Sequence, residues 1–239
     1  MPGSTPAKPV DCTIDFDPSS LIDKTAVVTG GASGLGEAYV RALINAGAKV
    51  CFGDRDIQRG EGLASSLEKC SFVPCDVTNW DDQVRLFSKA GSLSLSGKID
   101  YVVANAGIVH ADDVFTFDGP FAKKPTLSII DVNLKGALYT AKLAMHHFIL
   151  QNGATPSATQ SDTCLILIGS GAAYLDCPRG PQYSASKYAM RGIMHSLRRT
   201  AYYYGSRVNM ISPWYRCGEG GRASCDGGGC RGVFTENIE

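Results

Sequence analysis

The sequence predicts an α/β fold, a doubly wound parallel sheet in a single domain, and two observations lead to it. Short runs rich in β-branched and aromatic residues alternate with longer stretches of helical periodicity, and the short runs are apolar almost without interruption. Such runs are typical of strands that helices cover on both faces, as in parallel sheets. Because strand–helix–strand crossovers are right-handed, the sheet should be doubly wound, as in a Rossmann fold.

The expected elements follow one another in a regular order. Strands are expected at residues 25–29, 49–53, 71–74, 100–104, 165–169 and 207–211, and helices at 35–46, 57–68, 80–89, about 128–151 and about 184–204. The strand runs are short and the helical stretches long, which separates the two types. A polar segment between the fourth helix and the fifth strand should be a surface loop.

Changes in composition divide the chain into three regions. Residues 1–20 are rich in Pro, Ser and Asp and are expected to form a loose arm. Residues 21–214 carry all the strand and helix patterns and form the single domain. Residues 215–239 are rich in Gly, Arg and Cys and show neither a strand nor a helix period, so we expect an irregular tail that buries no core face.

The charges balance, because 23 Lys and Arg residues are matched by 23 Asp and Glu residues. This balance gives no reason to expect a nucleic acid or an anionic membrane as a partner. The longest apolar stretches are too short to span a bilayer, and the first residues contain no apolar signal-peptide core. We therefore expect a soluble, cytoplasmic protein.

The chain has nine cysteines, and those in apolar runs, such as Cys51, Cys70, Cys75 and Cys164, are expected to be buried thiols, as in a reducing compartment. Three other cysteines, Cys217, Cys225 and Cys230, lie in the predicted tail without a close C-x-x-C pair. We therefore expect no metal site.

A glycine-rich loop, T29-G-G-A-S-G-L-G36, joins the first predicted strand to the first helix. Gly30 allows a tight turn, Gly34 allows a pyrophosphate to approach the backbone, and Gly36 allows the helix to pack closely on the strand. The helix N-terminus then offers free N–H groups and a positive dipole end to the phosphates. The loop predicts a dinucleotide site that includes Gly30, Ser33, Gly34, Leu35 and Gly36. A tight strand-to-helix turn without a ligand could require the same glycines.

Asp54 ends the second predicted strand, where a carboxylate can accept hydrogen bonds from the adenosine ribose and would repel a 2′-phosphate. This favours NAD over NADP, although Arg55 beside it points the other way. Alternatively, Asp54 simply caps a turn. Five further positions follow the third and fourth strands and could line the cofactor: Asp76, Val77, Asn105, Ala106 and Gly107.

A second group of residues lies towards the C-terminus. Tyr183 and Lys187 share one face of a helix, so the ammonium can favour the phenolate of a tyrosine whose reference pKa is about 10. Ser170 follows a strand, where its hydroxyl can hold a substrate oxygen. The group predicts proton exchange with an alcohol or carbonyl oxygen. A chance Tyr/Lys pair and a turn-forming serine are the alternatives.

These motifs together resemble the short-chain dehydrogenases/reductases over about residues 22–214. The matching positions are 29–36, Asp54, Asp76, Val77, 105–107, Asn133, Ser170, Tyr183, Lys187, Ser212 and Pro213. Within the family the chain is most similar to fungal NAD-dependent members near 15-hydroxyprostaglandin dehydrogenase and 5'-hydroxyaverantin dehydrogenase.

The resemblance implies an oxidoreductase that moves a hydride between NAD(H) and a secondary alcohol or ketone. It implies that Tyr183 is the general acid/base, that Lys187 reaches the nicotinamide ribose, and that Pro213 lies beside the cofactor. It further implies that Asn133 kinks its helix and anchors a water. Members pair two long helices into a homodimer, so the stripe Leu134, Leu138, Ala141 and Met145 is expected to face either a partner or the core.

The chain departs from the family after Pro213. Members have a glycine next, then a threonine that touches the nicotinamide amide, a covering helix and a seventh strand. Here Trp214 follows, and nothing after Arg216 resembles a strand. We therefore expect a sheet without its last strand and an incomplete lid. The alternative function is a weakly active or inactive protein that binds a dinucleotide.

Overall fold

The computed structural model describes residues 17–94, 96–114, 116–156, 161–175 and 177–214. The predicted tail, with its three cysteines, and most of the predicted arm lie outside these residues. The described part of the arm forms a short 3₁₀ turn, η1 (Pro18–Leu21), and Asp17 caps it by accepting a hydrogen bond from the amide of Ser19.

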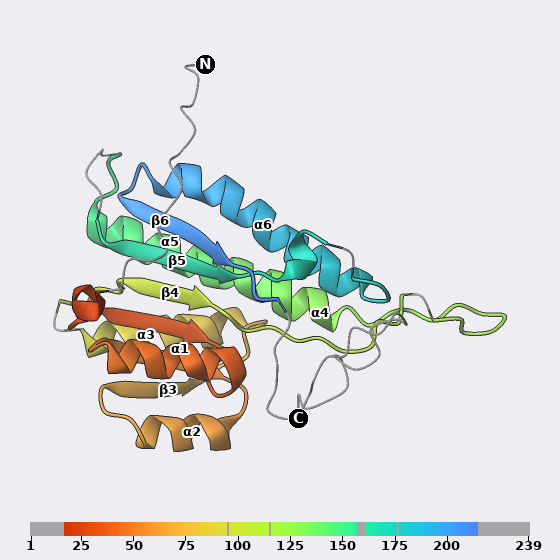
Figure 1. Cartoon of the computed structure of the whole chain (residues 1–239), viewed down its shortest axis with the longest axis horizontal. Helices are drawn as coiled ribbons and strands as arrows, with labels where there is room; N and C mark the ends of the chain where they lie inside the picture. The colour runs from red at the N-terminus through yellow and green to blue at the C-terminus, as the bar shows by residue number, and fades with distance from the viewer. Residues whose placement is uncertain (1–16, 95, 115, 157–160, 176, 215–239) are drawn as a thin grey trace, which may run out of the picture.

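Six parallel strands form one sheet in the order β3-β2-β1-β4-β5-β6 (Figure 1). The strands are β1 (Thr25–Thr29), β2 (Lys49–Asp54), β3 (Cys70–Pro74), β4 (Tyr101–Ala104), β5 (Thr163–Ile168) and β6 (Ser206–Ile211). The predicted doubly wound parallel sheet is confirmed. The strand order reverses between β1 and β4, and ligands of such sheets bind at the carboxyl ends of the strands beside this point.

The helices connect successive strands. They are α1 (Gly34–Asn45), α2 (Ile57–Ser65), α3 (Trp80–Leu93), α4 (Ser128–Ile130), α5 (Ala137–Asn152) and α6 (Pro181–Ala201), with a 3₁₀ turn η3 (Gly171–Ala173) after β5. The long helix predicted from about residue 128 is interrupted by a π-helical stretch, η2 (Asp131–Gly136), which joins α4 to α5.

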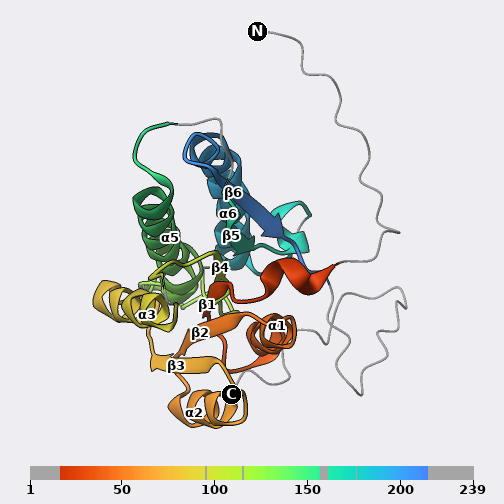
Figure 2. The ribbon, with the colours of Figure 1, turned by 90° about the vertical axis from the view of Figure 1, so that its left-hand side faces the viewer.

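The helices cover both faces of the sheet. Side chains of α3, α5 and α6 share one core with the first face, while those of α1 and α2 share a second core with the other face. Figure 2 shows α3 and α5 on one side of the strands and α1 on the opposite side. Val27 and Val28 of β1, which are both fully buried, belong to the two different cores. This two-sided burial explains the continuous apolar runs.

Among the described residues, β6 forms one edge of the sheet, with β5 as its neighbour. Arg207, Asn209 and Ile211 alternate along β6 and are exposed, whereas Val208 is buried. The described sheet has six strands, and the segment for which the sequence predicted no seventh strand lies outside the described residues. No helix of the described residues is both long enough and apolar enough to cross a membrane.

Candidate active site

The glycine-rich loop takes the backbone conformation that its glycines were predicted to allow. Gly30 and Gly34 have positive φ angles of 66° and 59°, in the left-handed region that L side chains rarely adopt. The amide of Gly30 donates to the carbonyl oxygen of Gly53 at 2.7 Å, which ties the turn to the end of β2. The predicted tight turn at Gly30 is thus confirmed.

Gly36 is where α1 packs against this turn. A Cβ atom added at Gly36 would lie 1.8 Å from the carbonyl oxygen of Gly30 and 2.6 Å from Nδ2 of Asn105. The Asn105 amide in turn donates to the carbonyl oxygens of Thr29 and Gly30 at 3.0 and 2.9 Å. Asn105 therefore holds the loop in place, and only glycine fits at position 36.

The first turn of α1 is open at the carboxyl edge of the sheet. Ser33 precedes the helix, its side chain makes no capping hydrogen bond, and Ser33, Gly34 and Leu35 are exposed. The amide of Glu37 is already bonded to the carbonyl oxygen of Ser33. A helix end of this kind can bind an anion, because its first N–H groups and its dipole both favour negative charge.

Asp54 lies at the end of β2 beside the loop. Its two carboxylate oxygens accept hydrogen bonds from the amides of Ala32 at 2.9 Å and Asp56 at 3.1 Å. Asp54 therefore does support the turn, which was the simpler of its two interpretations. The carboxylate lies beside the glycine-rich loop, and because Asp54 is only half-buried, part of its surface remains accessible.

The other predicted cofactor positions lie along the same edge. Asp76 accepts two hydrogen bonds from Thr78, and the exposed Arg55 lies 3.8 Å from its carboxylate. Val77 is buried against Gly136, with 6% of its surface exposed. Ala106 donates its amide to the Thr29 hydroxyl at 3.2 Å.

Tyr183 and Lys187 lie one turn apart on α6, as predicted. The Nζ atom of Lys187 is 5.6 Å from the centre of the Tyr183 ring and donates to the carbonyl oxygen of Ile168 at 3.0 Å. Only 6% of the Lys187 surface is exposed. A hydrogen bond at the end of β5 therefore fixes the lysine, so that its charge lies under the tyrosine ring.

Burial dominates the titration of both side chains. It raises the pKa of Tyr183, against an opposing hydrogen bond with Ser170, and it lowers the pKa of Lys187 to about 8. The sequence predicted only the attraction between ammonium and phenolate, which would lower the tyrosine pKa. With these shifts, Tyr183 keeps its proton and Lys187 keeps most of its charge at neutral pH.

Ser170 joins the end of β5 to this pair. Its hydroxyl caps η3 by accepting from the amide of Ala172 at 3.1 Å, and it lies close enough to the Tyr183 phenol to lower the pKa of that group against the effect of burial. The turn-forming role that was the alternative for Ser170 is therefore real. It is compatible with the predicted site, because the same oxygen is held beside the phenol.

Asn133 lies within the π-helical stretch and is 2% exposed. Its amide exchanges two hydrogen bonds with the backbone of Ile108, at 2.7 and 2.9 Å, and donates to the hydroxyl of Ser186 at 3.2 Å. A Cβ atom added at Gly107 would lie 3.3 Å from Oδ1 of Asn133 and 3.7 Å from Nζ of Lys187. The fold thus brings Gly107, Asn133 and Lys187 together.

Two residues that the sequence did not single out hold the start of α6. The buried side chain of Gln182 donates to Asp112 at 3.1 Å and to the carbonyl oxygen of Thr126 at 2.8 Å, while its backbone amide donates to Asp112 at 2.7 Å. Asp112 therefore caps the helix from another part of the chain, immediately before Tyr183. The position of Gln182 next to Tyr183 was the one available signal, and nothing local pointed to Asp112.

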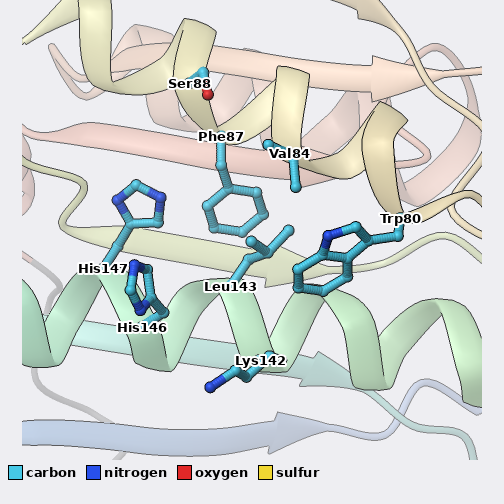
Figure 3. A pocket seen from close by; sticks show the side chains of 8 residues that line it. All are labelled: Trp80, Val84, Phe87, Ser88, Lys142, Leu143, His146 and His147. Carbon is cyan, nitrogen blue, oxygen red and sulfur yellow. The ribbon is translucent and has the colours of Figure 1, made fainter.

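A separate groove of about 400 Å³ lies between α3 and α5 (Figure 3). Its lining comprises Trp80, Val84, Phe87, Ser88, Lys142, Leu143, His146 and His147, and includes none of the predicted site residues. Among the residues that the structure describes, no group of three or more His, Cys, Asp or Glu side chains is arranged to hold a metal ion.

Comparison with known proteins gives a consistent assignment. Residues 24–216 match the short chain dehydrogenase family. The 5'-hydroxyaverantin dehydrogenase stcG of Emericella nidulans is 34% identical over 220 residues, 87% of this chain and 71% of that protein. The NADP-dependent dehydrogenase clz5 of Cochliobolus lunatus is 30% identical over 231 residues, 92% of this chain and 80% of that protein.

The fold also matches a solved structure, the 3-ketoacyl-(acyl-carrier-protein) reductase of Brucella melitensis in complex with NADH. The TM-score is 0.71 at 24% identity, and the match covers 82% of this chain and 77% of the other. The predicted resemblance to the family, and to fungal hydroxyaverantin dehydrogenases within it, is confirmed. This chain belongs to the short-chain dehydrogenases, and it is an oxidoreductase of that family.

Proposed function

We propose that the protein transfers a hydride between NAD(H) and a secondary alcohol or ketone. The observation that supports this most is the convergence of Ser170, Tyr183 and Lys187 at the carboxyl ends of the strands, on the same edge as the glycine-rich loop. Tyr183→Phe tests it most simply, because it removes only the hydroxyl that would exchange the proton.

The described residues fit a dinucleotide. The open end of α1 suits the pyrophosphate, and the missing side chain at Gly34 allows it to approach. Asp54 would hold the adenosine ribose, and Asp76 and Val77 would border the adenine. The residues that would line the remainder are Gly30, Ser33, Leu35, Gly36, Asn105, Ala106, Gly107, Tyr183, Lys187 and Pro213.

When bound, the dinucleotide supplies the hydride for a carbonyl carbon or accepts it from an alcohol carbon. Ser170 holds the substrate oxygen, and Tyr183 donates a proton to that oxygen in reduction or takes the hydroxyl proton in oxidation. Burial raises the pKa of Tyr183, so the phenol carries the proton that reduction requires at neutral pH. Reduction of a ketone is therefore the direction in which to measure activity first.

Lys187 and Asn133 act behind the tyrosine in this proposal. The charge of Lys187 stabilises the phenolate that remains after proton donation, and its amine lies close to Gly107 and Asn133. Asn133 holds this arrangement together through its bonds to Ile108 and Ser186. These contacts of Asn133 position Lys187 to return a proton to Tyr183.

The carboxylate of Asp54 favours NAD(H) over NADP(H), since it would repel the additional phosphate of NADP(H). We expect Asp54→Asn, which removes the charge and keeps an oxygen for the amide of Ala32, to narrow the preference by about tenfold, or about 1.4 kcal/mol. Fluorescence titration with NADH and NADPH measures both affinities. Asp56→Asn, which alters the nearby carboxylate that caps α2, should leave their ratio unchanged.

One relative is named as NADP-dependent, and the exposed Arg55 points towards NADP(H), so comparing the two affinities decides between the cofactors. Equal or tighter binding of NADPH by the unaltered protein would show that Asp54 does not select the cofactor.

A second candidate function is dinucleotide binding without turnover. It is favoured by Trp214, which stands at a position where family members have glycine. The Trp214 ring packs on Gly171, next to Ser170. Tight NADH binding combined with no reduction of any ketone in a broad panel would support this function over the first.

We also propose a homodimer formed by α5 and α6. Of the predicted stripe, Ala141 and Met145 are buried in the core, whereas Leu138 is 45% exposed. We expect light scattering to give a dimer mass at micromolar concentration and Leu138→Arg to shift the protein towards monomer, because a charge would enter an apolar interface. Ile57→Arg on α2, across the sheet, is the matched control for an exposed apolar side chain. A monomer in the unaltered protein would contradict the proposal.

A further inference from the structure

We propose that Trp214 forms an aromatic wall of the substrate site and that it selects alcohols and ketones carrying a flat aromatic ring near the reacting carbon. The proposal deepens the proposed function and rests on it. Trp214 stands at the position where this chain departs from the family pattern. The backbone beyond β6 continues beside the loop after β5 and brings Trp214 there.

Backbone hydrogen bonds continue between these two segments after both strands have ended. Within the sheet Ile168 is the register partner of Ile211. Beyond it, the amide of Gly169 donates to the carbonyl oxygen of Ile211 at 2.7 Å, and the amide of Gly171 donates to that of Pro213 at 2.9 Å. This ladder fixes the path of the chain into Trp214 and places it beside the loop that carries Ser170.

The indole ring packs directly on Gly171. A Cβ atom added there would lie 1.6 Å from Cε3 and 1.9 Å from Cζ3 of Trp214, so any side chain at position 171 would overlap the ring. Gly171 follows Ser170, whose hydroxyl lies close enough to Tyr183 to lower the pKa of its phenol. One part of the indole is therefore anchored next to the reacting pair, while 55% of the Trp214 surface remains exposed.

Two more exposed apolar residues are bonded to Gly171 through their backbone. The amides of Tyr174 and Leu175 both donate to the carbonyl oxygen of Gly171, at 2.9 and 3.0 Å. Tyr174 is 47% exposed and Leu175 is 55% exposed, and the Tyr174 ring packs on the guanidinium of Arg191 at 4.6 Å. We call Tyr174, Leu175 and Trp214 the Gly171 rim.

Single exposed apolar residues are ordinary, but three around one glycine beside a polar reacting group are typical of a binding site. Aromatic rings gain from stacking beyond the burial of their area. A substrate whose oxygen lies at Ser170 and Tyr183 could therefore place an adjoining ring against the indole. A saturated ring of the same size would bury similar area but would not stack.

The test compares two ketones that differ in this one property: benzylacetone and its cyclohexyl counterpart. Their carbonyl groups are equally reactive and their chains have the same length. With NADH as reductant, we expect kcat/KM to favour benzylacetone in the unaltered protein, and Trp214→Ala to reduce that preference by about five- to tenfold. Trp214→Phe keeps a ring and should retain most of it.

Trp80→Phe is the matched control. Trp80 is the other tryptophan of the chain and lies in the groove between α3 and α5 (Figure 3). Its ring meets that of Tyr139 edge to face. This variant should leave the ratio of the two ketones unchanged. An unchanged ratio in Trp214→Ala as well would overturn the proposal.

A binding measurement separates this proposal from the proposed function. In Trp80→Phe the remaining fluorescence comes from Trp214, so saturable quenching or a spectral shift on adding benzylacetone to the NADH-loaded protein reports stacking directly. If neither ketone is reduced but benzylacetone alone produces this change, the hydride-transfer function fails and the aromatic wall stands. If benzylacetone is reduced without any change at Trp214, the wall is wrong and the function stands. If neither is observed, both proposals are wrong.

Discussion

Replacing Tyr183 by phenylalanine should reduce turnover at least about a hundredfold while leaving NADH affinity close to that of the unaltered protein. The substitution removes one hydroxyl, and the aromatic ring still fits above Lys187. Proton transfer is lost, whereas the glycine-rich loop that would bind the dinucleotide is untouched. Steady-state reduction of a ketone measures turnover, and fluorescence titration measures affinity.

Tyr188 offers a matched control on the same helix, since it is 47% exposed and lies outside the site. Tyr188→Phe should retain nearly full activity. A Tyr183→Phe variant that kept more than about a tenth of the rate would show that another group exchanges the proton.

Replacing Gly36 by alanine should abolish dinucleotide binding and lower the melting temperature. The added methyl carbon would lie 1.8 Å from the carbonyl oxygen of Gly30, so α1 and the loop would have to move apart. Such overpacking costs about 1–3 kcal/mol, which for a chain of this size lowers Tm by roughly 2–4 °C per kcal/mol. Calorimetry and NADH titration together measure the two effects.

Gly62 provides the control for this substitution. It lies in the middle of α2, and a Cβ atom added there meets nothing within 4 Å. Gly62→Ala should leave NADH binding unchanged and stabilise the fold by about 0.5–1 kcal/mol, because alanine loses less backbone freedom on folding. If Gly36→Ala bound NADH as tightly as the unaltered protein, the glycine-rich loop would not be the phosphate site.

The sequence predicted well those features that depend on residues close together in the chain. The strands begin and end within about two residues of their predicted limits, because continuous apolar runs report burial on both faces. Tyr183 and Lys187 are one helical turn apart, so their proximity follows from the sequence alone. Gly30 and Gly36 are required by a turn and a close contact that a strand-to-helix junction imposes.

The features that the sequence did not predict depend on contacts between distant segments. Asp112 caps the helix that carries Tyr183 from 70 residues away, and Trp214 reaches Gly171 through a ladder between two strand ends. The raised pKa of Tyr183 depends first on burial, which could not be judged from an i, i+4 spacing. The π-helical turn at Asn133 was expected only as a kink.

Transfer of deuterium from NADH labelled at C4 of the nicotinamide is the most direct measurement of the proposed chemistry. Two forms of NADH are tested in turn, each with deuterium on one of the two faces of C4. The form labelled on the reacting face should give an alcohol that carries one deuterium on its carbinol carbon. Mass spectrometry of the product from benzylacetone detects it, and Tyr183→Phe should give almost none. Reduction in which neither labelled form passes deuterium to carbon, or binding of NADH without any alcohol formed from a panel of ketones, would contradict direct hydride transfer at Ser170, Tyr183 and Lys187.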